Sequence, residues 1–269
     1  MYAIPKELEN HPCFNNDAHH KYGRIHLPVA KRCNISCNYC DRNYHCVNQS
    51  RPGVTRRIMT PMEALKYLKE NNTYFNKLTV AGIAGPGEPL DNDETFQTLK
   101  LVKDEFPNLI KCVSTNGLLL SDKVQDLIES GVSSITLTLN TLRIDTAMKI
   151  YSSTGISCKG LSHREWAEMF LFKQRQGLID TVKSGITVKL NTIFIPGIND
   201  NEIEEIAMFG KENGVSMMNI MPLIPQGKFK GVKEPNVLEI NTAKMTAGKH
   251  MNQLNSCGRC RADAVGLIK

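Results

Sequence analysis

The sequence lacks any apolar run long enough to span a membrane, and its N-terminus, MYAIPKELENHPC, is polar, unlike a secretory signal. It also lacks low-complexity tracts, short-period repeats and runs of five or more basic residues. These absences argue against a membrane span, export, a repeat array and a nucleic-acid footprint. The formal net charge of +6 counts every thiol as neutral, and metal-bound thiolates would bring it toward zero. We therefore expect a cytoplasmic protein with no membrane or nucleic-acid partner.

Cysteine is what the sequence has in unusual number, with nine among 269 residues. Without an export signal, so many thiols indicate a reducing compartment and metal binding in preference to disulfides. The length fits a single α/β barrel domain with a sizeable core.

Strand and helix signals alternate along the chain. Short apolar or β-branched segments bounded by Gly, Asn or Pro predict strands at residues 24–30, 77–83, 111–114, 134–139, 186–193 and 216–221. Helices are predicted from Thr60-Pro61 onward and at about residues 93–105, 121–129, 163–184 and 200–213. Six strand–helix units in series predict an α/β fold, an open, partial (βα)6 TIM-type barrel with parallel strands. Chemistry in such barrels lies at the C-terminal ends of the strands.

Three thiols follow the first predicted strand at the spacing C-x3-C-x2-C: Cys33, Cys37 and Cys40, with Tyr39 before the last. Three thiolates can hold three irons of a [4Fe–4S] cluster and leave the fourth iron open for a substrate or cofactor. A zinc site or a set of core thiols is the alternative, although zinc usually takes two separated Cys/His pairs. With the aromatic residue included, the motif resembles the signature of the radical S-adenosylmethionine (SAM) superfamily. In that superfamily the open iron binds SAM, and an electron cleaves it to methionine and a 5′-deoxyadenosyl radical.

The same resemblance suggests residues that contact SAM. Gly85 and Gly87 would let the backbone approach the ligand, and the Glu88 carboxylate would lie near the methionine ammonium group. Polar or strand-end positions after later strands could meet the SAM carboxylate or ribose; these are Ser114, Asn116, Asn140 and Ile195. Each is alternatively an ordinary turn or helix cap.

Six further side chains suggest that the chain holds more than one cluster. They are Cys13, His26, Cys46, Cys112, Cys257 and Cys260, the last two at C-x2-C spacing. A buried thiol or imidazole can also be purely structural. Taken together, they predict one or two additional Fe–S clusters beside the first. Cys158 receives no role.

Motifs along almost the whole chain resemble the NifB family of nitrogenase cofactor biosynthesis proteins. Beside the Cys triplet they are HPC (11–13), AHH (18–20), RIH (24–26), YHC (44–46), SRPGV (50–54), GIAGPG (82–87), CVSTNG (112–117), IPGIND (195–200), NIMPL (219–223) and CGRCRADAVG (257–266). The sequence departs from the family pattern at Lys31-Arg32 and at His45, and neither departure removes a thiol. The resemblance is to the short standalone form of methanogens. It implies a single domain, 1–269, without a NifX-like second domain. The parts would be an N-terminal extension (1–22), the barrel (23–222) and a C-terminal extension (223–269), with both extensions closing the barrel mouth.

The family resemblance implies fusion of two [4Fe–4S] precursor clusters into an eight-iron, carbide-containing precursor of the nitrogenase cofactor. One SAM would supply the carbon and a second the radical. Expected partners are SAM, Fe–S cluster donors, cofactor carrier or scaffold proteins, and an electron donor such as a ferredoxin. Two alternatives remain open: a radical SAM enzyme with one auxiliary cluster and an organic substrate, and a non-catalytic Fe–S or zinc carrier.

Overall fold

The structure is a computed structural model that describes residues 5–41, 49–75, 77–152, 160–254 and 260–268. Its centre is a curved sheet whose six main strands are parallel and lie side by side in chain order. These strands are β1 (Gly23–His26), β3 (Leu78–Ile83), β4 (Ile110–Thr115), β5 (Val132–Thr138), β7 (Thr187–Phe194) and β8 (Met217–Pro222). The predicted partial (βα)6 barrel is confirmed.

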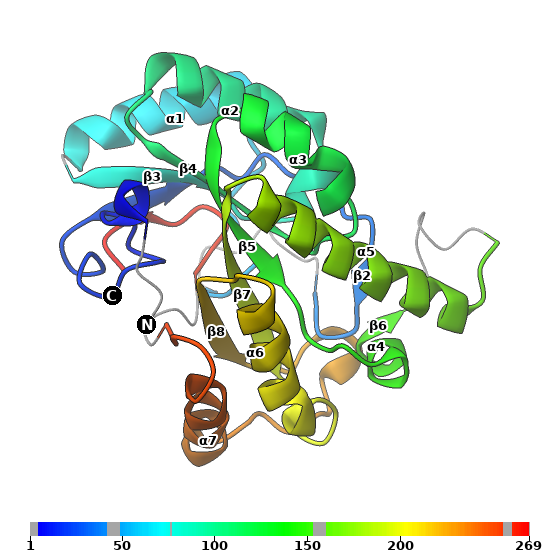
Figure 1. Ribbon diagram of the computed structural model, residues 1–269. Helices are drawn as coiled ribbons and strands as arrows, with labels where there is room; N and C mark the ends of the chain where they lie inside the picture. The colour runs from blue at the N-terminus through cyan, green and yellow to red at the C-terminus, as the bar shows by residue number, and fades with distance from the viewer. Residues whose placement is uncertain (1–4, 42–48, 76, 153–159, 255–259, 269) are drawn as a thin grey trace.

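Helices cover the outside of this sheet (Figure 1). They are α1 (Pro61–Tyr74), α2 (Asp93–Glu105), α3 (Leu120–Glu129), α5 (His163–Lys183) and α6 (Ile203–Glu212), with α4 (Ile144–Ile150) and α7 (Val237–Gly248) beside them. Helix α1 begins with the predicted cap. The Thr60 hydroxyl accepts a hydrogen bond from the Glu63 amide, and the Glu63 carboxylate accepts one from the Thr60 amide. The segment predicted as a helix from residue 200 begins as a 3-10 turn, Asp200–Glu202, before α6.

The first predicted strand is shorter than expected, because β1 ends at His26 and not at residue 30. Pro28 has no amide hydrogen, so it cannot continue the ladder of backbone hydrogen bonds. A single bridge between Ala30 and Pro86 resumes the pairing beyond it.

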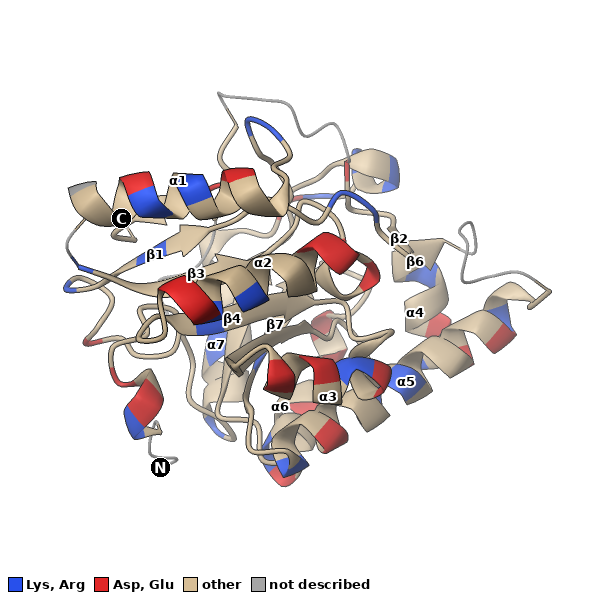
Figure 2. Cartoon of the chain, turned by 90° about the horizontal axis from the view of Figure 1, so that it is seen from above, with Lys and Arg blue, Asp and Glu red and all other residues tan. Residues whose placement is uncertain are grey.

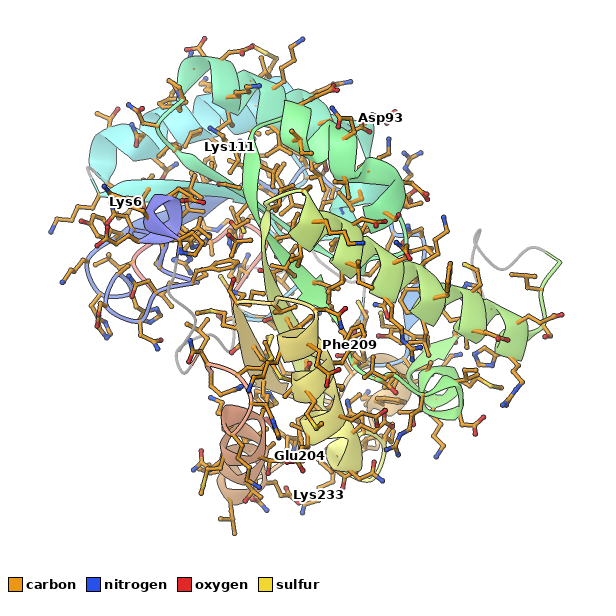
Figure 3. All side chains as sticks on the ribbon, in the orientation of Figure 1. Lys6, Asp93, Lys111, Glu204, Phe209 and Lys233 are labelled. Atoms are coloured by element: carbon orange, nitrogen blue, oxygen red, sulfur yellow. The ribbon has the colours of Figure 1, made fainter. Side chains whose placement is uncertain are left out.

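The outer face of the sheet packs against the helices, and the helices carry the charged surface of the molecule. Apolar residues on the outer face of the sheet, such as Val113 and Ile135, pack with helix residues such as Leu68, Leu99 and Leu127. Charged residues of both signs are interspersed over α1, α2, α3 and α5 (Figure 2). Exposed Lys6, Asp93, Glu204 and Lys233 lie at the rim of the molecule (Figure 3). Among the described residues, no helix combines the length and apolar character needed to cross a lipid bilayer.

Both terminal segments pack against the barrel. In the N-terminal segment, Leu8 and Phe14 form a buried cluster with Val80, Cys112 and Met217, which lie in the first halves of their strands. This extension therefore closes the interior at the end where the strands begin, and not at the mouth, where it was predicted. The C-terminal segment adds a short antiparallel strand, β9 (Val265–Gly266), to the free edge of β1.

Candidate functional site

A cavity of about 290 Å³ opens on the concave side of the sheet. The predicted site residues that line it are Cys13, His26, Cys33, Cys37, Cys40, Gly87, Glu88, Cys112, Ser114, Asn116 and Cys260. Gly85, Asn140 and Ile195 do not line it. Cys46 and Cys257, like Cys158, lie outside the described residues. The barrel thus brings residues more than 240 positions apart into one chamber.

The loop of the Cys triplet is fixed by a small sheet beyond the barrel. Strand β2 (Ser36–Cys37) pairs with β6 (Tyr151–Ser152), which follows helix α4. The Asn38 amide donates to the Ile150 carbonyl at 2.8 Å, and the Asn38 side chain donates to the Lys149 carbonyl at 2.8 Å. The three thiols therefore sit on a backbone held by pairing and not on a free loop.

The glycine-rich segment after β3 holds the other side of this loop. The Gly87 amide donates to the Ala30 carbonyl, and the Glu88 amide to the Arg32 carbonyl, each at 2.7 Å. A Cβ atom on Gly87 would lie 2.1 Å from the Arg32 carbonyl oxygen, so only glycine fits. Gly85 has a φ of +120°, which also favours glycine. These glycines allow the segment after β3 to lie close against the backbone that precedes Cys33.

Asn92, which the sequence analysis missed, ties the same two segments together. Its side chain is 2% exposed. Its Oδ1 accepts from the Lys31 and Arg32 amides at 3.1 and 3.0 Å, and its Nδ2 donates to the carbonyls of Arg32 and Glu88 at 3.0 and 2.7 Å. The only local signal, an Asn before a helix, reads as an N-cap.

The Glu88 carboxylate is buried and already accepts three hydrogen bonds. Its donors are the Leu90 amide (3.0 Å), the Thr115 hydroxyl (2.6 Å) and the Asn116 amide (2.7 Å). Burial raises the pKa of Glu88 to about 7, although these hydrogen bonds pull it the other way. Glu88 therefore joins the end of β4 to the glycine-rich segment, on the wall of the cavity.

Asn140 and Ile195 belong to a buried network behind the cavity wall. Asn140 Nδ2 donates to the hydroxyls of Tyr39 and Tyr151 at 3.0 Å, and its Oδ1 accepts from the Ile193 amide at 2.9 Å. Ile195 is completely buried, and its amide donates to the Asn199 side chain at 2.8 Å. Through the Tyr39 hydroxyl, Asn140 supports the loop of the Cys triplet, and its predicted contact with SAM stays a prediction.

A second group of thiols lies deeper, near the beginning of the strands. Cys112 faces the interior from β4, and burial raises the pKa of its thiol. Lys189 on β7 is 2% exposed, and its ammonium group donates to the Cys13 carbonyl at 2.9 Å and lies 4.8 Å from the centre of the Phe14 ring. This buried cation was not predicted, because its only signal in the sequence is a lysine within a strand that mixes apolar and polar residues.

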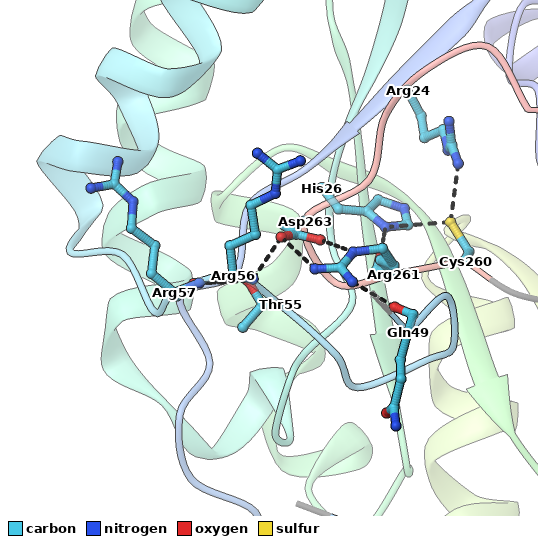
Figure 4. Close-up of polar contacts among 9 residues, drawn as sticks. All are labelled: Arg24, His26, Gln49, Thr55, Arg56, Arg57, Cys260, Arg261 and Asp263. Atoms are coloured by element: carbon cyan, nitrogen blue, oxygen red, sulfur yellow. Dashed lines mark hydrogen bonds and ion pairs between the residues drawn. The ribbon is translucent and has the colours of Figure 1, made fainter. Parts of the chain in front are cut away.

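Cys260 and His26 meet on the opposite wall (Figure 4). The sulfur lies 3.7 Å from His26 Nδ1, and Arg24 Nη2 donates to it at 3.3 Å. Burial alone would raise the pKa of the Cys260 thiol, but His26 and Arg24 outweigh it and lower the pKa to about 6. A thiolate is thereby favoured before any metal binds.

A clasp holds the segment that carries Cys260; it consists of Arg261 and Asp263 with the loop of residues 49–57 (Figure 4). The Arg261 guanidinium binds the Asp263 carboxylate at 2.7 Å, and the Arg56 amide donates to the same carboxylate at 2.7 Å. Arg261 also donates to the Gln49 carbonyl at 2.5 Å. The Arg261 carbonyl oxygen, 2.9 Å from His26 Nδ1, links this clasp to the cavity.

The donors fit Fe–S clusters. Among the described residues, no three His, Cys, Asp or Glu side chains are close enough to share a single metal ion. A cubane places a different requirement on the chain, since each thiolate binds its own iron. Cys33, Cys37 and Cys40 on one fixed loop could supply three such thiolates, and Cys13, Cys112, Cys260 and His26 could add three thiolates and an imidazole. The charges of Lys189 and Arg24 would offset the negative charge of thiolate-bound clusters.

Comparison with known proteins agrees with a site for Fe–S clusters. Residues 27–210 match the family model of the radical SAM superfamily. A protein of Methanocaldococcus infernus named FeMo cofactor biosynthesis protein NifB is 44% identical over 97% of this chain and 87% of its own length. Proteins of the same name from Chlorobaculum tepidum and Azotobacter vinelandii are 40% and 37% identical. The chain spans 62% and 54% of the length of these two relatives.

Solved structures agree at the level of the fold. SuiB from Streptococcus suis superposes with a TM-score of 0.60 at 14% identity, covering 88% of this chain and 48% of SuiB. Methylornithine synthase (PylB) superposes with a TM-score of 0.55 at 16% identity, covering 88% of this chain and 65% of PylB. Sequence, cavity and fold converge, and the chain belongs to the radical SAM superfamily and, within it, to the NifB family.

Proposed function

We propose that this chain is a radical SAM enzyme of nitrogenase cofactor biosynthesis, which fuses two [4Fe–4S] clusters into an eight-iron, carbide-containing precursor. The observation that carries the proposal is the single cavity. It joins the Cys33, Cys37 and Cys40 loop to a second, deeper set of ligand-type side chains. An enzyme that acted on an organic substrate would have no evident need for so many soft ligands facing one chamber.

At the mouth of the cavity, Cys33, Cys37 and Cys40 would hold the SAM-binding cluster. When bound, that cluster supplies the electron that cleaves SAM. The backbone that precedes Cys33 is held by Gly87 and Asn92, so the loop that would hold the cluster is already ordered. Of the proposed SAM contacts, Gly87, Glu88, Ser114 and Asn116 line the cavity, whereas Gly85, Asn140 and Ile195 do not.

Deeper in the barrel, Cys13, His26, Cys112 and Cys260 would hold the two precursor clusters as substrates. Cys46 and Cys257, which lie outside the described residues, are the other two proposed ligands. Two cubanes contain eight irons, so six such ligands leave some irons free for remodelling. One SAM would methylate a substrate sulfide, and the radical from a second SAM would abstract hydrogen from that methyl group.

The proposal extends to partners. A protein that acts on clusters needs a donor of those clusters, a carrier that accepts the product and an electron donor such as a ferredoxin. These partners, and a cytoplasmic location, are part of the proposal.

The test is iron per chain after anaerobic reconstitution, with a Cys33/Cys37/Cys40 triple alanine variant beside it. We expect about 12 irons in the parent and about 8 in the variant, which also forms no 5′-deoxyadenosine. Cys112→Ala should still cleave SAM but form no eight-iron product. About 4 irons falling to near zero would leave a radical SAM enzyme without a cluster substrate. Clusters without any 5′-deoxyadenosine would indicate a carrier.

A further inference from the structure

The two histidines of the cavity are held in opposite tautomers. His26 Nδ1 lies 2.9 Å from the Arg261 carbonyl oxygen, which can only accept, so this nitrogen carries the proton. When the His26 ring is neutral, its Nε2 has the lone pair that a metal ligand requires. His11 Nδ1 instead accepts a hydrogen bond from the Cys13 amide at 3.1 Å, so in His11 the proton is on Nε2.

Among the residues that the structure describes, none accepts a hydrogen bond from the Nε2–H group of His11. His11 is 1% exposed, and its Nε2 is buried and has no hydrogen-bond partner among the residues that the structure describes. A buried donor left unpaired is destabilising, and native structures rarely leave one. The ring lines the cavity and packs 4.6 Å, centre to centre, from Phe14. Because the ring lines the cavity, a molecule bound there can supply the acceptor that the described residues do not.

We propose that His11 Nε2–H donates a hydrogen bond to a sulfur atom of the substrate cluster that Cys13 holds. This inference rests on the proposed function. Through Nδ1, His11 fixes the amide of Cys13, so any cluster bound to that thiol lies beside the same ring. Thiolate and sulfide sulfurs accept N–H hydrogen bonds, and such bonds tune the reduction potential of a cluster.

His11 is consequently a substrate-positioning donor and not an iron ligand. Ligation through Nε2 would move the proton to Nδ1 and place two N–H groups against each other at Cys13. Ligation through Nδ1 would remove the acceptor of the Cys13 amide. The two histidines thus have different roles: His26 offers a lone pair to a metal, and His11 offers a hydrogen-bond donor.

Two variants separate these roles. His11→Asn keeps an oxygen near the position of Nδ1 for the Cys13 amide but has no donor that reaches the position of Nε2. His11→Gln keeps an amide donor near the position of Nε2. Both are made in the full chain on the Cys33/Cys37/Cys40 triple alanine background, which removes the signals of the SAM cluster. After anaerobic reconstitution, iron per chain and the midpoint potential are measured, the latter by a redox titration followed by electron paramagnetic resonance.

We expect His11→Asn to keep its iron and to shift the midpoint potential to a more negative value, since the reduced cluster loses a donor. His11→Gln should stay close to the parent potential. Loss of iron in His11→Asn would make His11 a ligand and overturn the inference. Equal potentials in all three proteins would reduce it to a structural residue and overturn it as well. If the background protein itself binds no iron, the proposed function fails, and that result is distinct from a missing shift at normal iron content.

Discussion

At the scale of single residues, Glu88 combines a structural and an electrostatic role. Its carboxyl group is buried behind three donors, and burial raises its pKa to about 7 from 4.5. For a carboxyl whose pKa is higher in the folded state, the stabilising contribution is fully present below the unfolded value. It is lost as the pH rises through the folded value. Glu88 should therefore weaken the fold between about pH 4.5 and 7.

Replacement of Glu88 by Gln removes this titration. The difference in unfolding free energy between Glu88→Gln and the parent should move in favour of the variant by up to about 3 kcal/mol as the pH rises through this range. Thermal unfolding of both apoproteins at several pH values measures the difference. Glu7→Gln, an exposed position, is the matched control and should show a much smaller change. A difference that is constant with pH would contradict the account of Glu88.

Asn92 offers a second test at this scale, because one side chain makes four hydrogen bonds to the segments on either side of the site. Asn92→Ala should destabilise the protein by about 2–4 kcal/mol and reduce the iron held by the Cys triplet. Urea unfolding and iron content measure the two effects. In Asn213→Ala, which loses one bond to the Phe209 carbonyl at a half-exposed site, both should change little. Equal losses in the two variants would show that the four hydrogen bonds of Asn92 contribute no more than the single bond of Asn213.

At the scale of elements, the glycine-rich segment acts by close approach of two backbones. In Gly87→Ala the new Cβ meets the Arg32 carbonyl carbon at 2.6 Å and its oxygen at 2.1 Å, both rigid backbone atoms. We expect a loss of several kcal/mol of stability and a cluster loop that no longer holds iron at full occupancy. Gly231→Ala is the control, because a Cβ there has no atom within 4 Å. If both variants bind iron like the parent, the segment does not position the cluster loop.

The elements that the sequence predicted are those with a repeated local signal. Six apolar strands with helices between them gave the barrel and its strand order. Helix α4 has only seven residues, and the pair β2–β6 only two residues per strand, too short for any period to show. Helix α7 was missed because it has no clear apolar face, with Val237, Leu238 and Met245 all exposed.

In the site, too, residues with a local signal were predicted and residues that act through distant contacts were not. Thiols and imidazoles were found from spacing and chemistry, because few other residue types bind iron. The residues that hold them in place were missed, since Asn92 and Lys189 act on partners 60 and 176 positions away. Tertiary contacts at such separations leave no local pattern. Conversely, Asn140 was predicted to contact SAM, and in the structure its side chain forms hydrogen bonds with Tyr39, Tyr151 and Ile193.

At the scale of the whole molecule, the half-barrel depends on its terminal segments for closure. The N-terminal segment fills the end where the strands begin, and the C-terminal segment adds β9 to the free edge of β1. Arg24 on β1 donates to the carbonyls of Gly266 and Leu267 at 2.7 and 3.1 Å and also to the Cys260 sulfur. Docking of the tail against β1 therefore also places Cys260 beside His26 and Arg24.

The clasp of Arg261 and Asp263 is the contact through which this coupling can be broken. The Asp263 side chain is 8% exposed and accepts from both Arg261 and the Arg56 amide. In Asp263→Ala we expect residues 49–57 and 260–268 to exchange amide hydrogens faster together, while β4 and β5 stay protected. Asp145→Ala, which removes a highly exposed ion pair with Arg164, should change neither segment. Faster exchange in residues 260–268 alone would mean that β9, and not the clasp, holds the loop, and the coupling argued here would be wrong.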